Sequence, residues 1–181
     1  MRFTPTAIPD VIVLEPVVHG DERGFFMETW RKNEFAEVGI GADFVQENHS
    51  KSAHGILRGL HYQIPNPQGK LVRVISGEVF DVVVDLRRQS PAFGKWVGEI
   101  ISSENRKQLW VPPGFAHGFL VISETAELVY KCTDYYSPEH ERCIAWDDPD
   151  LCIDWPGLKQ APVLSEKDAS GMSFDKAEYY K

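Results

Sequence analysis

Short strand-like segments separated by turn residues occupy most of the chain, and this pattern constrains the fold more than any other feature. The clearest segment is Glu78–Leu86, whose side chains alternate between two faces. Phe80, Val82, Val84 and Leu86 lie on one face, whereas the other carries Asp81 and Asp85. We expect the apolar face to pack against other elements, and the two acids to face water or line a polar cavity.

Further segments have the composition of short strands: Val11–Leu14, Phe25–Trp30, Leu71–Ile75, Trp96–Ile101, Gln108–Val111, Gly118–Ile122 and Ala126–Tyr130. One short helix is expected at Asn33–Gly39, with Asn33 as its N-cap and Gly39 as its C-terminal stop. Many short strands with so little helix indicate an all-β sandwich or barrel.

The length of 181 residues fits one domain, so residues 1–181 are expected to form a single unit. A domain of this size buries roughly 70% of its unfolded surface and needs no disulfides to fold. Residues 162–181 are more polar than the rest and are expected to form a helix or a loose tail.

The net charge of −8, without a block rich in Lys or Arg, argues against nucleic acid or an anionic membrane as the main partner. The three cysteines form no Cys-x-x-Cys pair, which fits a reducing compartment. The first ten residues lack an apolar signal core, and no apolar run approaches the ~18 residues of a membrane span. We therefore expect a soluble, cytoplasmic protein.

Two histidine motifs indicate what kind of barrel this is. Pro112-x-Gly114-x-x-His117 has the spacing of the second cupin motif, in which a turn directs a histidine into the barrel. The first cupin motif supplies His-x-His and then Glu, but this chain has His61-Tyr-Gln63 and then Lys70. A lysine near the position of the acid repels a divalent cation, and two histidines are too few ligands for a typical site. The sequence therefore predicts no metal, and activity that survives chelation.

A longer series of motifs runs in order, without large gaps, over roughly residues 2–168: Arg23-Gly-Phe-Phe26, Gln46-Glu-Asn48, Leu57-Arg-Gly-Leu-His-Tyr-Gln63, Lys70-Leu-Val-Arg73, Asp81-Val-Val-Val-Asp-Leu-Arg87, Pro112-Pro-Gly-Phe-Ala-His-Gly-Phe119, Tyr130-Lys131 and Ser165-Glu-Lys-Asp168. In these motifs the chain closely resembles the dTDP-4-dehydrorhamnose 3,5-epimerases. One departure is Glu47, where Asp is common in the family.

The resemblance implies a homodimeric, cupin-type jelly-roll β-barrel with minor short helices and no cofactor. It implies inversion of C3 and C5 of dTDP-4-dehydro-6-deoxy-D-glucose, giving dTDP-4-dehydro-L-rhamnose. The catalytic residues that carry over are His61 as the base, Asp168 as the group that orients it, and Tyr130 as the acid on the opposite face of the sugar.

The substrate contacts that the resemblance implies are Arg23, Glu28, Gln46, Glu47, Asn48, Arg58, Lys70, His117, Tyr136, Glu141 and Lys167. Among them, the ring of Tyr136 is expected to stack on the thymine. Because N-terminal strands cross the dimer interface in the family, Arg23 and Glu28 are expected to serve the site of the neighbouring subunit.

The chemistry itself requires residues of these types. The hydrogens on C3 and C5 both lie α to the C4 ketone, so removing either one gives an enolate. Such a carbon acid is on the order of ten pKa units weaker than imidazolium, so a cation or hydrogen-bond donor must stabilise the C4 oxyanion, and Lys70 is the natural candidate. Inversion also needs an acid on the other face. The planar fork of Arg58 suits the diphosphate.

Several alternatives remain open at this stage. Asp81 or Asp85, rather than Asp168, could orient His61, because both lie on a strand that could face the cavity. A C3-only or C5-only epimerase of a related deoxysugar nucleotide would use the same residues. A metal-dependent cupin enzyme is disfavoured by Gln63 and Lys70. A non-catalytic sugar-nucleotide-binding barrel would not need His61 and Tyr130 together.

Overall fold

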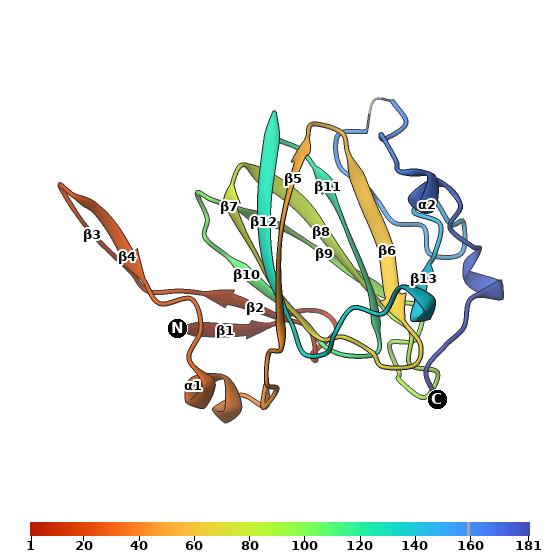
Figure 1. Cartoon of the computed structure of the whole chain (residues 1–181), viewed down its shortest axis with the longest axis horizontal. Coiled ribbons are helices and arrows are strands. Elements are labelled where there is room, and N and C mark those ends of the chain that lie inside the picture. The colour runs from red at the N-terminus through yellow and green to blue at the C-terminus, as the bar shows by residue number, and fades with distance from the viewer. Residues whose placement is uncertain (159) are drawn as a thin grey trace.

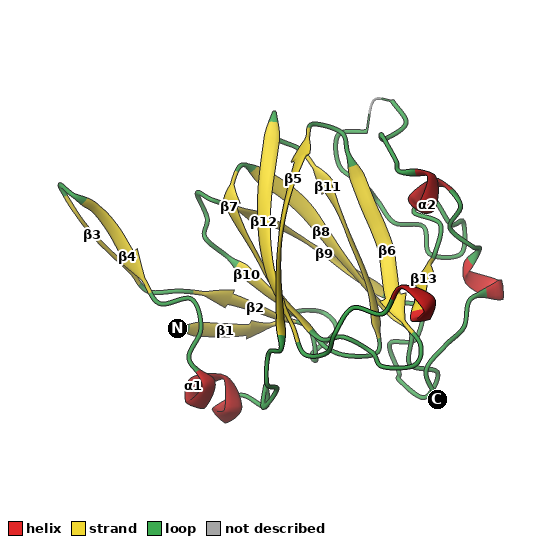
Figure 2. Ribbon diagram, in the orientation of Figure 1, coloured by secondary structure: helices red, strands yellow, loops and turns green. Residues whose placement is uncertain are grey.

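Two antiparallel sheets face each other in the computed structural model, which describes residues 1–158 and 160–181 (Figure 1). The first sheet has the strand order β1 (Arg2–Pro5), β2 (Ile12–Glu15), β10 (Gln108–Val111), β7 (Lys70–Ser76), β12 (Thr125–Cys132) and β5 (Gln46–Ala53). The second has the order β13 (Glu141–Cys143), β6 (Leu57–Gln63), β11 (Phe115–Val121), β8 (Glu78–Asp85) and β9 (Trp96–Ser102). Strands dominate and the helices are short, as Figure 2 shows.

The space between the sheets is the main apolar core. Val72 and Leu128 of the first sheet and Val83 and Phe119 of the second belong to one buried cluster. Alternation along β8 places Val79 and Val83 in this core, while Val82 and Val84 point to the outer face of the second sheet.

That outer face is covered by the segment that follows β13. Leu57, Val82 and Leu120 of the sheet pack in a second cluster with Leu151 and Trp155. Both faces of β8 are therefore buried, and Asp81 and Asp85 are inaccessible to solvent. Of the two environments expected for these acids, open water is excluded.

Residues 162–181 are an ordered part of this cover rather than a loose tail. They contain α2 (Glu166–Ala169) and a 3-10 turn, η2 (Phe174–Lys176); a similar turn, η1 (Pro138–His140), precedes β13. Ala177 is buried, and the hydroxyl of Tyr180 donates a 2.6 Å hydrogen bond to the carbonyl of Gln63 on β6. The C-terminal segment is thus attached directly to a strand of the barrel.

The N-terminal region supplies one helix, α1 (Lys32–Glu37). Its N-cap position is Arg31, without a side-chain cap, so the prediction of Asn33 as the cap is wrong. The helix is held instead by Phe35, which is 1% exposed and meets Phe3 with 5.4 Å between ring centroids. Within the described residues, no helix has the length and apolar character needed to cross a membrane.

A two-stranded hairpin, β3 (Val18–Asp21) and β4 (Gly24–Met27), projects away from the two sheets (Figure 1). Its strand β4 ends three residues earlier than expected from the run Phe25–Trp30. Phe25 and Phe26 are 59% and 70% exposed, which is unusual for two adjacent aromatic residues.

Candidate active site

A cavity of about 350 Å³ lies between the two sheets and is lined by polar side chains from both. The lining residues are Gln46, Asn48, Ser50, Arg58, His61, Lys70, His117, Gly118, Phe119, Tyr130, Tyr136, Glu141 and Lys167. Most of the residues that the sequence nominated are therefore brought together. Ser50, Gly118 and Phe119 were not foreseen, because the sequence does not show which strands pair around the cavity.

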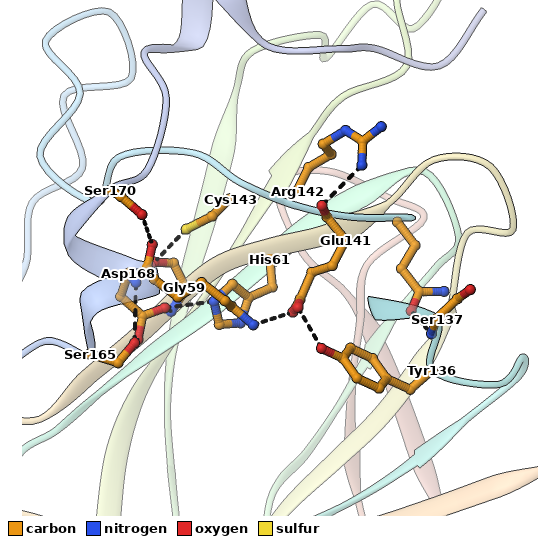
Figure 3. Close-up of polar contacts among 12 residues, drawn as sticks. Gly59, His61, Tyr136, Ser137, Glu141, Arg142, Cys143, Ser165, Asp168 and Ser170 are labelled. Carbon is orange, nitrogen blue, oxygen red and sulfur yellow. Dashed lines mark hydrogen bonds and ion pairs between the residues drawn. The ribbon is translucent and has the colours of Figure 1, made fainter. Parts of the chain in front are cut away.

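His61 on β6 is held by Asp168 of α2, as Figure 3 shows. The distance from His61 Nε2 to Asp168 Oδ1 is 2.6 Å. Asp168 also accepts hydrogen bonds from the Gly59 amide at 3.2 Å and from the Ser165 hydroxyl at 2.6 Å. Burial alone would raise the pKa of Asp168, but the hydrogen bonds from His61, Ser165 and Gly59 lower it to about 2. This residue is a carboxylate at any physiological pH.

The pairing defines which nitrogen of His61 is basic. Because the Asp168 carboxylate can only accept a hydrogen bond, Nε2 carries the proton and the lone pair lies on Nδ1. Burial lowers the pKa of His61, partly opposed by Asp168, so the ring is neutral at pH 7. A neutral imidazole with a fixed tautomer in a polar cavity is suited to take a proton from a ligand.

The other two candidate acids are occupied elsewhere. Asp81 Oδ1 lies 2.8 Å from His117 Nε2, and Asp85 binds Arg87 and Ser90. Among the alternatives that the sequence left open, Asp168 is therefore the residue that contacts His61.

His117 on β11 lies directly opposite His61 in the strand pairing. Two glycines allow this close approach: a Cβ atom on Gly59 would lie 2.5 Å from the Cα of Gly118. Gly59 also has φ of +129°, a conformation that side chains with a Cβ rarely adopt. The two histidines consequently line one cavity, each with its own carboxylate.

Tyr130 reaches the cavity from the opposite sheet, on β12, where it pairs with Asn48 of β5. Burial raises the pKa of Tyr130, so the phenol keeps its proton at neutral pH. The cavity thus has a neutral imidazole on one sheet and a protonated phenol on the other.

Two cationic side chains in the cavity have no carboxylate partner among residues 1–158 and 160–181: Lys70 and Arg58. Arg58 Nε donates a 3.0 Å hydrogen bond to Ser52 Oγ, while its side chain is exposed. Burial lowers the pKa of Lys70. Positive groups without counter-ions favour an anionic ligand.

At the edge of the cavity, Glu141 links two of the predicted substrate contacts (Figure 3). Its Oε2 accepts a 2.6 Å hydrogen bond from the Tyr136 hydroxyl, and its Oε1 lies 2.6 Å from Lys167 Nζ. These hydrogen bonds outweigh burial and lower the pKa of Glu141. The ring of Tyr136 is 47% exposed and accessible for stacking.

Gln63, at the position where cupins have their second histidine, serves as a structural residue. It is 3% exposed; its amide nitrogen donates to the carbonyls of Asn66 at 2.9 Å and Tyr135 at 3.3 Å, and its oxygen accepts from the Ser137 amide at 2.9 Å. Gln63 therefore fixes the loop that carries Tyr136.

Three predicted contacts do not line the cavity of this chain. Arg23 pairs with Asp21 at the tip of the projecting hairpin, and Glu28 pairs with Arg31 at 2.7 Å. Glu47 pairs with Lys131. Strand alternation turns Glu47 to the opposite face of β5 from Gln46 and Asn48, which explains its position.

Sequence reasoning also overlooked the role of Ser165, whose hydroxyl donates a hydrogen bond to the Asp168 carboxylate. Its hydroxyl accepts a 3.2 Å hydrogen bond from the Asp168 amide as the N-cap of α2. A serine three residues before an acid is the usual signature of such a cap, so the signal was present.

Comparisons with known proteins show which family the chain resembles. The family profile described as dTDP-4-dehydrorhamnose 3,5-epimerase matches residues 5–176. The chain is 61% identical to the enzyme of that name from Pseudomonas aeruginosa, over 99% of both chains, and 56% identical to the one from Shigella flexneri, again over 99% of both.

Solved structures of similar enzymes share the fold of this chain. A dTDP-6-deoxy-D-glucose-3,5-epimerase from Legionella pneumophila, in complex with dTDP-4-keto-L-rhamnose, superimposes with a TM-score of 0.95 at 51% identity, covering 98% of this chain and 94% of that one. A 3'-monoepimerase from Streptomyces bikiniensis, in complex with dTDP-quinovose, has a TM-score of 0.86 at 36% identity, with coverage of 93% and 86%. The predicted all-β, cupin-type fold is confirmed. Because the family model matches most of its length, and relatives share more than half of its sequence and its fold, the chain belongs to the dTDP-4-dehydrorhamnose 3,5-epimerase family.

Proposed function

We propose that the cavity inverts C3 and C5 of dTDP-4-dehydro-6-deoxy-D-glucose to give dTDP-4-dehydro-L-rhamnose. The observation that carries the residue roles is the placement of His61 and Tyr130 on opposite sheets of one cavity. A sugar ring between them would have a base on one face and an acid on the other. This is the minimum that inversion through an enolate requires.

The steps follow from the protonation states described above. His61 Nδ1 removes the proton from the carbon next to the C4 ketone, and Asp168 stabilises the imidazolium that results. The negative charge that develops on the C4 oxygen is placed near Lys70, which has no carboxylate partner in the described part of the chain. Tyr130 then delivers its proton to the other face of the same carbon.

The decisive experiment is incubation with the 4-keto sugar nucleotide in deuterated water. We expect deuterium at both C3 and C5, and NMR couplings of the L-rhamno product. A second candidate, a C3-only epimerase, is favoured by the likeness to the 3'-monoepimerase from Streptomyces bikiniensis. Label and inversion at C3 alone would establish that alternative, and no label at either carbon would refute proton transfer at this cavity.

Recognition of the diphosphate is assigned to Arg58. Replacing Arg58 with alanine removes charge-assisted hydrogen bonds worth about 1.5–3 kcal/mol, so dTDP should bind about ten- to a hundredfold more weakly. Isothermal titration calorimetry with dTDP alone measures this directly. Lys51→Ala is a matched control, because this residue pairs with Glu127 at 2.9 Å and does not line the cavity. Unchanged dTDP affinity in Arg58→Ala would exclude the contact.

A homodimer is the proposed assembly, with the β3–β4 hairpin reaching a neighbouring copy. The exposed rings of Phe25 and Phe26 support it, as does the distance of Arg23 from the cavity of its own chain. Arg23 and Glu28 would then complete the partner's site. Binding would be shared between two chains.

Shared sites can be tested by complementation. Arg23→Ala and His61→Asn should each be weakly active alone, whereas a mixture refolded together should regain up to about a quarter of the parent activity, because half of the dimers are mixed and each of those has one intact site. No gain on mixing would show that Arg23 acts only within its own chain, or not at all.

A further inference from the structure

Cys143 is the cross-strand neighbour of the proposed base, His61. It is the residue on β13 that pairs with His61 on β6, and its thiol is 3.5 Å from the carbonyl of Gly59 (Figure 3). Its Sγ, a ring nitrogen of His61 and a carboxylate oxygen of Asp168 all lie within 4.8 Å of one another. None of the roles described above uses this thiol.

We propose that His61, Cys143 and Asp168 form an inhibitory binding site for Zn²⁺. Nitrogen, thiolate and carboxylate are the three ligand types that zinc prefers, and three protein ligands with water in the fourth position make a common coordination sphere. A thiolate and a carboxylate also balance the two charges of the ion. The site is distinct from the cupin ligand set, because it uses Cys143 and Asp168 instead of residues 63, 70 and 117.

The geometry needs only small adjustments. Zinc bonds of about 2.0–2.3 Å place two tetrahedral ligands roughly 3.3–3.6 Å apart. His61 Nε2 and Asp168 Oδ1, now 2.6 Å apart, would have to separate by less than an ångström, and Cys143 would move inward by about one ångström. Side-chain rotations are sufficient for shifts of this size.

A second cavity gives a route to one of the proposed ligands, Asp168. This cavity has a volume of about 180 Å³, is lined by Asp168 and Ser165, and shares Arg58 with the substrate cavity. Lys167 precedes Asp168 in α2, and its pairing with Glu141 at 2.6 Å reduces its repulsion of a metal ion. Burial raises the pKa of Cys143 to about 12, so the thiol is protonated until a metal displaces the proton.

The positions of the protons explain why bound zinc would inhibit the enzyme. This explanation rests on the proposed function, in which His61 is the base. Zinc takes the lone pair of Nε2, so the proton now on Nε2 moves to Nδ1, and the thiol proton of Cys143 is released to solvent. The ring remains neutral, but its basic nitrogen now faces the metal instead of the sugar. No oxidation or reduction is involved. Substrate can still bind, but Nδ1 cannot accept a proton.

The test compares zinc inhibition in the parent and in Cys143→Ser, which keeps a polar group near the Gly59 carbonyl. We expect free Zn²⁺ at micromolar or lower concentration, set by a metal buffer, to inhibit the parent, and a chelator to restore its activity. Mg²⁺ should have no effect, because it prefers oxygen ligands. Cys143→Ser should keep its basal rate and need at least about tenfold more zinc for half inhibition. Cys152→Ser removes an exposed thiol that belongs to no group of three possible metal ligands among the described residues, so this variant should behave like the parent.

A binding readout separates this site from the proposed reaction. Cd²⁺ added to the purified protein should produce a thiolate-to-metal charge-transfer band in the ultraviolet, lost in Cys143→Ser and strongly weakened in His61→Asn. That band does not depend on turnover, so it appears even if the protein acts on another sugar. A parent resistant to zinc, equal inhibition of parent and Cys143→Ser, or a cadmium band that survives without Cys143 would each overturn the proposal.

Discussion

Replacing His61 with asparagine is expected to reduce epimerisation by about 10²–10⁴-fold, the usual contribution of a general base. Asparagine keeps the size and one polar contact of the imidazole but has no basic nitrogen, so proton removal at C3 and C5 should nearly vanish. The measurements are the epimerisation rate and deuterium uptake into the 4-keto sugar nucleotide.

Two further measurements show that the loss is chemical. The thermal unfolding temperature and the affinity for dTDP should stay near those of the parent, because His61 is replaced by a side chain of similar volume at a partly exposed position. Near-normal deuterium uptake in His61→Asn would place the base elsewhere in the cavity.

Replacing Tyr130 with phenylalanine is expected to separate exchange from inversion. The ring stays in place and only the hydroxyl is lost, so His61 can still form the enolate. The His61 side chain is 24% exposed. The proton that His61 accepts can therefore exchange with solvent before it returns to the sugar. Substrate recovered from deuterated water should carry label at C3 or C5 with its configuration unchanged, while product formation falls by about 10²-fold or more.

Mass spectrometry combined with NMR of the recovered sugar nucleotide distinguishes the outcomes. Label without inversion supports Tyr130 as the acid. Epimerisation at the parent rate would mean that water or another residue supplies the second proton, and absence of both label and product would mean that Tyr130 is also needed for proton removal.

The parts of this molecule that follow from local sequence were predictable. The two-residue period of β8 and the boundaries of β10 were read correctly, because alternation depends only on neighbouring residues. The same period separates Gln46 and Asn48 from Glu47, and applying it to β5 would have placed Glu47 outside the cavity. The cap of α1 was misassigned, since the burial of Phe35 outweighs the capping preference of Asn33.

Features that depend on strand pairing could not be predicted from local pattern. Asp81, Asp85 and Asp168 were all candidates for the partner of His61, and only the fold of the C-terminal segment over the second sheet decides among them. The pairing of Cys143 with His61 has the same origin. The residues stand 82 positions apart in sequence, and no pattern within either segment points to the other.

The three hydrogen bonds of Gln63 have an evolutionary consequence. A single substitution, Gln63→His, would recreate the His-x-His pair of metal-binding barrels, but it would also release the loop that presents Tyr136. Each buried hydrogen bond lost costs roughly 1 kcal/mol, and the ammonium group of Lys70 would still repel the incoming ion. An evolutionary path from this barrel to a metal-binding barrel therefore passes through the Gln63→His protein. That protein would hold the Tyr136 loop less firmly and would not yet bind a metal ion. Lineages on either side of such a barrier are expected to stay there.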